Sequence, residues 1–307
     1  MPRTATGTAA KRSGMSLNTR NTLVGMTFIL PNFIGFFCFV LIPVAFSFVL
    51  SFMEWDGFTE MKFVGIENFL DIFDDRVFRA ALVQTVTFSI FTVAFSMVLA
   101  LALAILLNNK LKGVNFFRAA IFFPYVASIV AVAAVFKAMF MKDGGPINEF
   151  LGLFLPDSML PGWLASTDWA LAACIIVQVW KNMGYFMIIY LAALQDIPYS
   201  LYEAAEIDGA TKWQQFRRIT FPMLTPSHFF VLMMLIINSF KVFDLIFMLT
   251  EGGPGTATQL LSMYIYNKSF ISWDYGVASA AAMILFLIVG GITLIQFRVE
   301  KKFNDFM

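Results

Sequence analysis

Polar and ionisable side chains interrupt two strongly apolar stretches of the sequence. Lys181 and Asn182 lie in WKNMGYFMIIY, and the second stretch is INSFKVFDLIF. Such groups are expensive at bilayer depth and therefore indicate a functional site. Amides and hydroxyls can hydrogen-bond the hydroxyls of a solute, while aromatic rings offer flat apolar faces to a pyranose. We therefore predict a sugar-sized polar cavity, and its candidate residues are Asn182, Tyr185, Phe186, Tyr190, Asn238, Ser239, Lys241 and Asp244.

A purely structural interpretation of the same residues stays open. Asn182, Asn238 and Ser239 could hold neighbouring helices together by hydrogen bonds. Lys241 and Asp244 are three positions apart, which on a helix would let them form an ion pair. A solute cavity and interhelical hydrogen bonding are thus the two alternatives.

The composition is that of a membrane protein. Of 307 residues, 59% are hydrophobic and only 13% are charged, whereas a soluble domain carries about 25% charged residues. Each long apolar run can cross a bilayer core of about 30 Å. The sequence predicts an all-α polytopic membrane protein. Its domain, residues 23–297, has six expected transmembrane helices at residues 23–52, 81–107, 119–140, 169–194, 229–249 and 275–297.

The distribution of Lys and Arg predicts the orientation of these spans. Most of them lie in the tails 1–22 and 298–307, in the loop between the second and third spans, and in the loop 195–228. Cytoplasmic loops carry an excess of Lys and Arg. We therefore expect a multi-pass protein of the cell membrane whose two termini and long loop are cytoplasmic.

Motifs for independent catalysis are missing from the sequence. It contains no GxxxxGK[ST] phosphate loop, no GxSxG, no HExxH and no CxxC pair. Its single histidine and its two cysteines, which lie in apolar runs, indicate neither a metal site nor a disulfide. A net charge of +1 suggests no role with nucleic acids. The chain is predicted to be a non-enzyme without a cofactor of its own, so the energy for any pumping would come from a partner.

The stretch 196–226 is mostly polar and is predicted to form two short helices. Ser200 is a candidate cap for the first helix, Asp208-Gly209 is a stop signal, and Thr211 is a candidate cap for the second. Pro222 should end the second helix. On its pattern alone this is a cytoplasmic loop with helical turns.

The spacing of particular residues within this stretch is more specific. Glu203-Ala204-Ala205, three residues, Gly209, nine residues, Ile219, one residue and Phe221-Pro222 resembles the EAA loop of ABC-importer membrane subunits. The family usually has Leu where this chain has Phe221. The resemblance implies a coupling helix that docks in a groove of the ATP-hydrolysing subunit. The residues implied for this coupling are Glu203, Ala204, Ala205, Asp208 and Gly209.

The resemblance extends over residues 20–300. LPNFIGFFCFVLIPVAFSFVLSF, FVGIENF and FKVFDLIFMLTEGGPGTAT are similar to permeases of the first carbohydrate-uptake group of ABC importers, with the type I transmembrane fold. This implies a prokaryotic inner or plasma membrane, a second and unlike permease, two ATP-binding subunits that hold ATP and Mg, and an extracellular or periplasmic solute-binding protein. By position, it adds Gly184 and Val242 to the expected substrate pathway.

Three further alternatives follow from the residues. An ion-coupled secondary transporter would also place ionisable groups inside spans. An ABC permease for another solute, such as a phosphorylated polyol, would share the loop 195–228. The acidic outer loop 53–79 is either simply solvated or a docking place for the binding protein, since charge complementarity guides such encounters.

Overall fold

The computed structural model describes residues 17–109 and 112–304, and the chain divides into two compact units between Val49 and Leu50. The described part of the first unit is one apolar helical segment, made of α1 (Leu17–Phe36), a π-helical turn (Phe37–Leu41) and all but the last residue of α2 (Ile42–Leu50). Its apolar side chains from Val24 onward are almost all exposed to the surroundings. Pro43 has no N–H to give to the helix, and the turn just before it is closed by a wider bond from the Ile42 N–H to the Phe37 carbonyl.

The second unit is helical apart from one small antiparallel hairpin, β1 (Met53–Glu54) with β2 (Lys62–Phe63). Its long helices are α4 (Arg76–Leu107), α8 (Ala170–Gln195) and α15 (Tyr275–Asn304). The shorter elements are α3 (Glu67–Asp74), α5 (Val114–Val126), α6 (Ile129–Met139), α7 (Pro146–Gly152), a 3-10 turn (Asp157–Met159), α9 (Tyr199–Ile207), α10 (Lys212–Gln215), a π-helical turn (Phe216–Thr220), α11 (Phe221–Met223), α12 (Thr225–Phe240), α13 (Asp244–Leu249), α14 (Leu261–Tyr266) and a π-helical turn (Asn267–Ile271).

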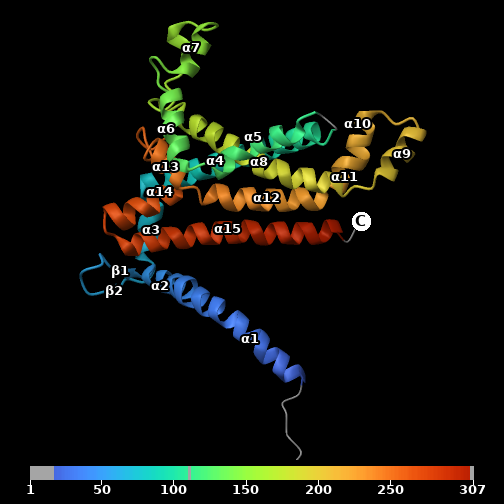
Figure 1. Cartoon of the computed structure of the whole chain (residues 1–307). Helices are drawn as coiled ribbons and strands as arrows, with labels where there is room; N and C mark the ends of the chain where they lie inside the picture. The colour runs from blue at the N-terminus through green and yellow to red at the C-terminus, as the bar shows by residue number, and fades with distance from the viewer. Residues whose placement is uncertain (1–16, 110–111, 305–307) are drawn as a thin grey trace, which may run out of the picture. The chain divides into compact units, whose positions relative to one another are not determined.

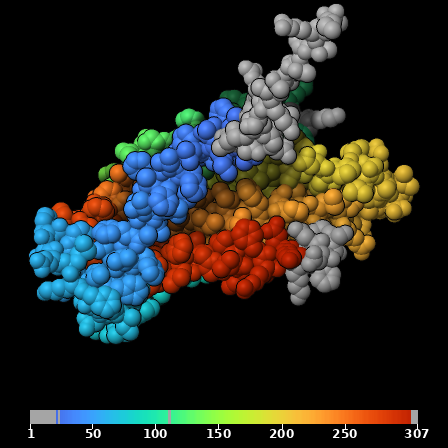
Figure 2. Space-filling model, turned by 90° about the horizontal axis from the view of Figure 1, so that it is seen from below, coloured from blue at the N-terminus to red at the C-terminus, as the bar shows by residue number. Residues whose placement is uncertain are grey.

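The helices of this unit form a bundle with different structures at its two ends. Helix α8 packs on α4 and α5, and α12 packs on α4, α8 and α15. The α9–α11 segment, residues 199–223, lies at one end of the long helices, and α3, α7, α13 and α14 lie at the other (Figure 1). Seen from below, the α9–α11 segment projects beyond the C-terminal part of α15 (Figure 2).

Small side chains on one face of α4 allow the close packing of the bundle. They recur every three or four residues and are buried, as a helix-packing face in a membrane requires. These positions are Ala81, Thr85, Ser89, Thr92, Ser96, Ala100 and Ala104.

Within residues 17–109 and 112–304, four helices are long and apolar enough to span a membrane: Val24–Leu50, Arg76–Leu107, Ala170–Gln195 and Tyr275–Lys301. Two bent helix pairs raise this number to six if each pair counts as one span. The pairs are Val114–Val126 with Ile129–Met139, and Lys212–Met223 with Thr225–Phe240.

The third expected span, residues 119–140, is not the continuous helix that its apolar run suggests. The chain bends by 98° between α5 and α6, where Ala127 and Ser128 have extended backbone conformations. Pro124 weakens the helix just before the bend because it lacks an N–H donor. A lysine of α8 supplies hydrogen bonds to the carbonyls that the break leaves free, as described below.

The fifth expected span, residues 229–249, is also wrong as a single helix. Helix α12 ends at Phe240, three residues without helical structure follow, and α13 begins at Asp244. Helix α13 packs on α6 instead of continuing α12, because Leu245, Ile246 and Leu249 belong to a core cluster with residues of α6 and α8. A hydropathy pattern alone cannot distinguish a broken helix from a continuous one.

Candidate functional site

Helix α9 ends in a Schellman motif that is built on Gly209. The Ala210 N–H donates to the Ala205 carbonyl at 2.8 Å, and the Gly209 N–H donates to the Glu206 carbonyl at 3.1 Å. Gly209 has φ +73°, a left-handed conformation that glycine adopts without steric cost. The expected stop at Asp208-Gly209 is therefore confirmed, and it sets the angle at which the chain leaves α9.

The next helix begins with the expected cap. The Thr211 hydroxyl accepts from the Gln214 N–H, and the Gln214 side chain accepts from the Thr211 N–H at 2.7 Å, which makes a capping box. The expected cap at Ser200 is wrong, because α9 starts at Tyr199 after Pro198 and has no side-chain cap. Pro198 itself fixes the backbone conformation needed just before the first helical residue.

The α9–α11 segment presents apolar side chains that nothing in the described residues covers. Ile207 is 86% exposed and Trp213 is 68% exposed, and Glu203 and Ala204, which precede them in α9, are exposed as well. An ion pair joins α9 to α10, with 2.5 Å between the Lys212 ammonium and the Glu206 carboxylate. This pair is exposed, so its contribution to stability is small. A projecting surface with large exposed apolar groups is typical of a protein interface.

A polar cavity of about 500 Å³ lies at the far ends of α5 and α12, beside the middle of α8. Five of the ten residues expected on the pathway line it, and three amides are among its walls. Its lining residues are Tyr125, Ile129, Gln178, Lys181, Asn182, Asn238, Lys241, Val242, Phe243, Asp244 and Leu245.

The breaks in the two helices create this cavity. Lys241, Val242 and Phe243 are the non-helical residues between α12 and α13, and Tyr125 lies just before the bend between α5 and α6. Irregular backbone at membrane depth is tolerated where it lines a cavity. The two departures from the expected spans thus belong to the same site.

Lys241 and Asp244 both line the cavity without forming the ion pair that the alternative interpretation would require. Both side chains are exposed. Among residues 17–109 and 112–304, the ion pairs are Lys212 with Glu206 and Lys268 with Asp75. The end of α12 at Phe240 removes the helical geometry on which the pairing of positions 241 and 244 depended.

Asn182 has a partner that the sequence analysis did not include. The Gln178 side-chain N–H donates to the Asn182 amide oxygen at 3.0 Å, one helical turn away on α8. The signal was present, because residues four apart share a helix face. This bond fixes the Asn182 amide so that its N–H group remains for another acceptor.

The other five expected pathway residues lie in the packing between helices. Tyr190 is buried, and its hydroxyl lies 3.0 Å from Nδ1 of His228 on α12. Phe186 belongs to the same apolar cluster, and the Ser239 hydroxyl donates to the Ile236 carbonyl. Tyr185 stacks on Tyr125, a residue of the cavity lining, with ring centroids 4.3 Å apart. Gly184 is the fifth of these residues.

Gly184 marks the closest approach of α8 to α5. A Cβ at this position would lie 2.0 Å from the Ile121 carbonyl oxygen and 2.8 Å from Cα of Phe122. Only glycine permits two helix backbones to come this close. Gly184 therefore brings the C-terminal end of α5, and Tyr125 with it, toward α8.

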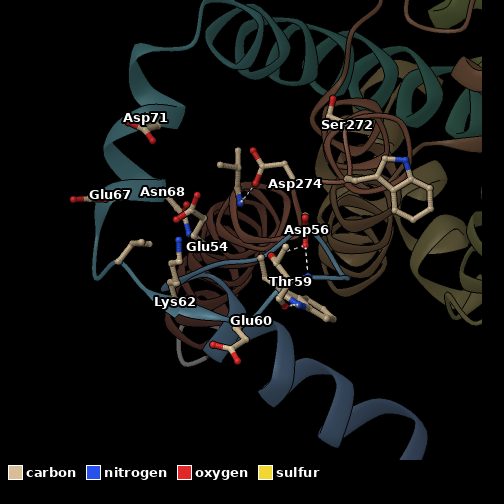
Figure 3. Close-up of a pocket in the computed structure, with 14 residues that line it drawn as sticks. Glu54, Asp56, Thr59, Glu60, Lys62, Glu67, Asn68, Asp71, Ser272 and Asp274 are labelled. Atoms are coloured by element: carbon tan, nitrogen blue, oxygen red, sulfur yellow. Dashed lines mark hydrogen bonds between the residues drawn. The ribbon is translucent and has the colours of Figure 1, made fainter.

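A second, acidic pocket of about 670 Å³ lies at the end of the bundle that also contains the hairpin (Figure 3). Lys62 is its one basic lining residue, and Asn68 fixes the hairpin by donating to the carbonyls of Ser51 and Met53. Its carboxylates come from Glu54, Asp56, Glu60, Glu67, Asp71 and Asp274.

Asp56 in this pocket is held ionised by its neighbours. The Thr59 and Phe58 N–H groups and the Thr59 hydroxyl all donate to its carboxylate, which lowers the pKa of Asp56 to about 2. The Asp56 carboxylate therefore stays ionised to a lower pH than an ordinary aspartate.

Comparison with known proteins identifies the family of this chain. The family of "Binding-protein-dependent transport system inner membrane component" matches residues 96–304. This chain belongs to that family. It is a permease subunit and a multi-pass membrane protein, as predicted, and not the ion-coupled secondary transporter of the alternative reading.

Individual relatives cover nearly the whole permease. It is 38% identical over 302 residues to the probable ABC transporter permease protein YesP of Bacillus subtilis, covering 97% of this chain and 96% of YesP. It is 38% identical over 297 residues to the lactose transport system permease protein LacF of Rhizobium radiobacter, covering 95% of this chain and 99% of LacF. A crystal structure of a bacterial ABC transporter that imports the acidic polysaccharide alginate contains a chain with a TM-score of 0.81 and 26% identity, over 93% of this permease and 97% of that chain. The predicted all-α ABC-importer transmembrane fold is thereby confirmed.

Proposed function

We propose that this permease forms half of the translocation pathway for a sugar or oligosaccharide. ATP is bound by partner ATPase subunits, and the α9–α11 segment transmits their movement to the helices around the cavity. The second half of the pathway comes from an unlike permease, and a solute-binding protein delivers the sugar from outside. The relatives named for lactose and for trehalose and maltose transport support a sugar as the solute.

The observation that carries this proposal is the projecting α9, whose C-terminal end is fixed by the Schellman motif at Gly209. Glu203, Ala204 and Ala205 lie on a helix whose exit is fixed by Gly209 and whose neighbour α10 is held by a capping box. A rigid, exposed element with small residues can enter a groove on another protein. We infer from the excess of Lys and Arg in the loop 195–228 and in the two tails that this loop and both termini face the cytoplasm.

The amides of the cavity support the choice of solute. Asn182 and Asn238 present N–H and C=O groups, and Tyr125 and Phe243 present ring faces within the same 500 Å³. Sugar binding uses this combination of amide hydrogen bonds and flat apolar surface. Lys241 and Asp244 have opposite charges, so these two residues leave their part of the wall electrically balanced.

Glu203→Ala and Gly209→Val test the coupling. Purified with its partner subunits and reconstituted in vesicles, each variant should lose ATP-driven sugar uptake and the stimulation of ATPase activity by the loaded binding protein. Valine at position 209 would be strained at φ +73° and would misdirect the chain after α9.

Glu149→Ala is the matched control, because Glu149 is equally exposed but lies on α7 at the other end of the bundle. It should keep uptake and ATPase stimulation at wild-type levels. Full uptake by both Glu203→Ala and Gly209→Val, with normal membrane insertion, would refute the coupling role of this segment.

A further inference from the structure

Lys181 is one of the residues that line the cavity, and its ammonium group is directed toward the break between α5 and α6. Its ammonium donates to the carbonyl oxygens of Pro124, Tyr125 and Ala127 at 3.3, 3.2 and 3.1 Å. An ammonium group has three N–H donors, so these three contacts use all of them. These partners lie more than fifty residues earlier in the chain, so the local sequence around Lys181 does not indicate them.

The carbonyls that Lys181 contacts are those that the break leaves without helical partners. The last carbonyls of a helix have no intrahelical donor, and they carry the negative end of the helix dipole. At bilayer depth such carbonyls are costly unless another group satisfies them. Within the described residues, Lys181 thus supplies both the donors and the positive charge that this helix end requires.

We propose that Lys181 is a positioning residue that holds the break between α5 and α6 open and so fixes one wall of the sugar cavity. Tyr125 and Ile129 lie on either side of the break and line the cavity together with Asn182, the residue next to Lys181. The stacking of Tyr185 on Tyr125 adds a second contact from α8 to the same helix end. This inference rests on the proposed role of the cavity as the sugar pathway.

The position of Lys181 also affects which solutes the cavity accepts. Because its donors are taken by backbone carbonyls, its charge is compensated by a helix end and does not serve as a receptor for an anionic group. If the lysine is removed, the carbonyls need other donors, and α5 and α6 would relax toward a continuous helix. Such a helix would displace Tyr125 and Ile129 from the cavity wall.

The test compares Lys181→Met, Lys181→Gln and Lys181→Arg in the full complex reconstituted in vesicles. Lys181→Met keeps the chain length but has no donor, and it should raise the KM for sugar uptake by about tenfold, since small displacements of a positioned group have large effects. Lys181→Gln retains two donors and should give an intermediate KM. Lys181→Arg retains both donors and charge and should stay close to the wild type.

A second measurement, the labelling rate of a cysteine in the cavity wall, does not depend on transport. In a background with Cys38→Ser and Cys174→Ala, Ile129→Cys is labelled with a membrane-impermeant maleimide. Lys181→Met should change the labelling rate several-fold, and Lys181→Arg should restore it. Lys137→Met is the control, because Lys137 is an exposed lysine of α6 outside the cavity lining, and it should leave both KM and labelling unchanged.

Wild-type KM and wild-type labelling in Lys181→Met would overturn this proposal. A wild-type complex that takes up no sugar with ATP would instead refute the proposed function, and the labelling of Ile129→Cys would still decide whether Lys181 holds the break.

Discussion

Gly184→Ala offers a sharp test of how the helices around the cavity are held together. The added methyl carbon would lie 2.0 Å from the Ile121 carbonyl oxygen and 2.7 Å from the Ile121 carbonyl carbon. Ordinary contact begins near 3.4 Å, so α5 and α8 would have to separate by roughly 1.4 Å at this point. The atoms in the way belong to the backbone, so no side-chain rotation can relieve the clash.

The expected cost is at the upper end of that for overpacked cores, about 3 kcal/mol. For 307 residues with an unfolding entropy of about 2.1 cal/mol/K per residue, that free energy corresponds to a fall in apparent Tm of roughly 5 °C. Separation of the two helices would also pull Tyr125 from its stacking on Tyr185. We therefore expect sugar uptake to fall together with the Tm of the detergent-purified complex, measured by scanning fluorimetry.

Gly290→Ala is the matched control for Gly184→Ala. Gly290 also lies in a long membrane-spanning helix, α15, but nothing lies within 4 Å of a Cβ added there. Its Tm should be unchanged or slightly higher, because alanine favours a helix more than glycine does. If Gly184→Ala has the same Tm and uptake as Gly290→Ala, the close approach of α5 and α8 is not a feature of the protein in the membrane.

Two further predictions concern the cavity and the opposite end of the bundle. Asn182→Ala and Asn238→Ala should each raise the KM for sugar uptake by about tenfold with little change in Tm, since each removes a hydrogen-bonding amide from the wall. If both variants keep the sugar preference of the wild type, the two asparagines have a structural role only. Burial disfavours the Asp75 carboxylate, but hydrogen bonds from the Tyr264 hydroxyl and the Val77 N–H and the charge of Lys268 outweigh it and lower its pKa. The stabilisation is therefore present above the unfolded pKa of about 3.9 and is lost as the pH falls further, so Asp75→Asn should lower Tm at pH 7 by an amount that shrinks below about pH 4.

Four of the six expected spans, at residues 23–52, 81–107, 169–194 and 275–297, coincide with long apolar helices of the structure, because burial in lipid requires long apolar runs. The sequence also predicted the turn at Gly209 and the cap at Thr211, because these depend on local chemistry at single positions. Both signals act over a few residues, so no tertiary contact is needed to interpret them.

What the sequence could not predict are the breaks at residues 127–128 and 241–243. The helix α5 stops where a lysine from α8, more than fifty residues later, supplies hydrogen bonds to its last carbonyls. Helix α12 ends at Phe240, and the following helix α13 packs on α6. Both breaks thus depend on contacts between residues that are far apart in the sequence. For the same reason Tyr190 and Ser239, which look like cavity residues by type, are used in packing between helices.

The two helices that bring amides to the cavity are the same two that flank the α9–α11 segment in the chain. Helix α8 contains Asn182 and ends at Gln195, just before α9 begins. Helix α12 starts after a bend of 65° at Leu224 and contains Asn238 near its other end. The buried contact between Tyr190 and His228 joins these helices between the segment and the cavity. A displacement of the α9–α11 segment therefore acts on both amide-bearing walls at once, whereas the third wall, at the break beside α5, is tied to α8 through Lys181. We expect the walls to move as one connected unit, because packed helices shift between discrete arrangements and do not deform continuously.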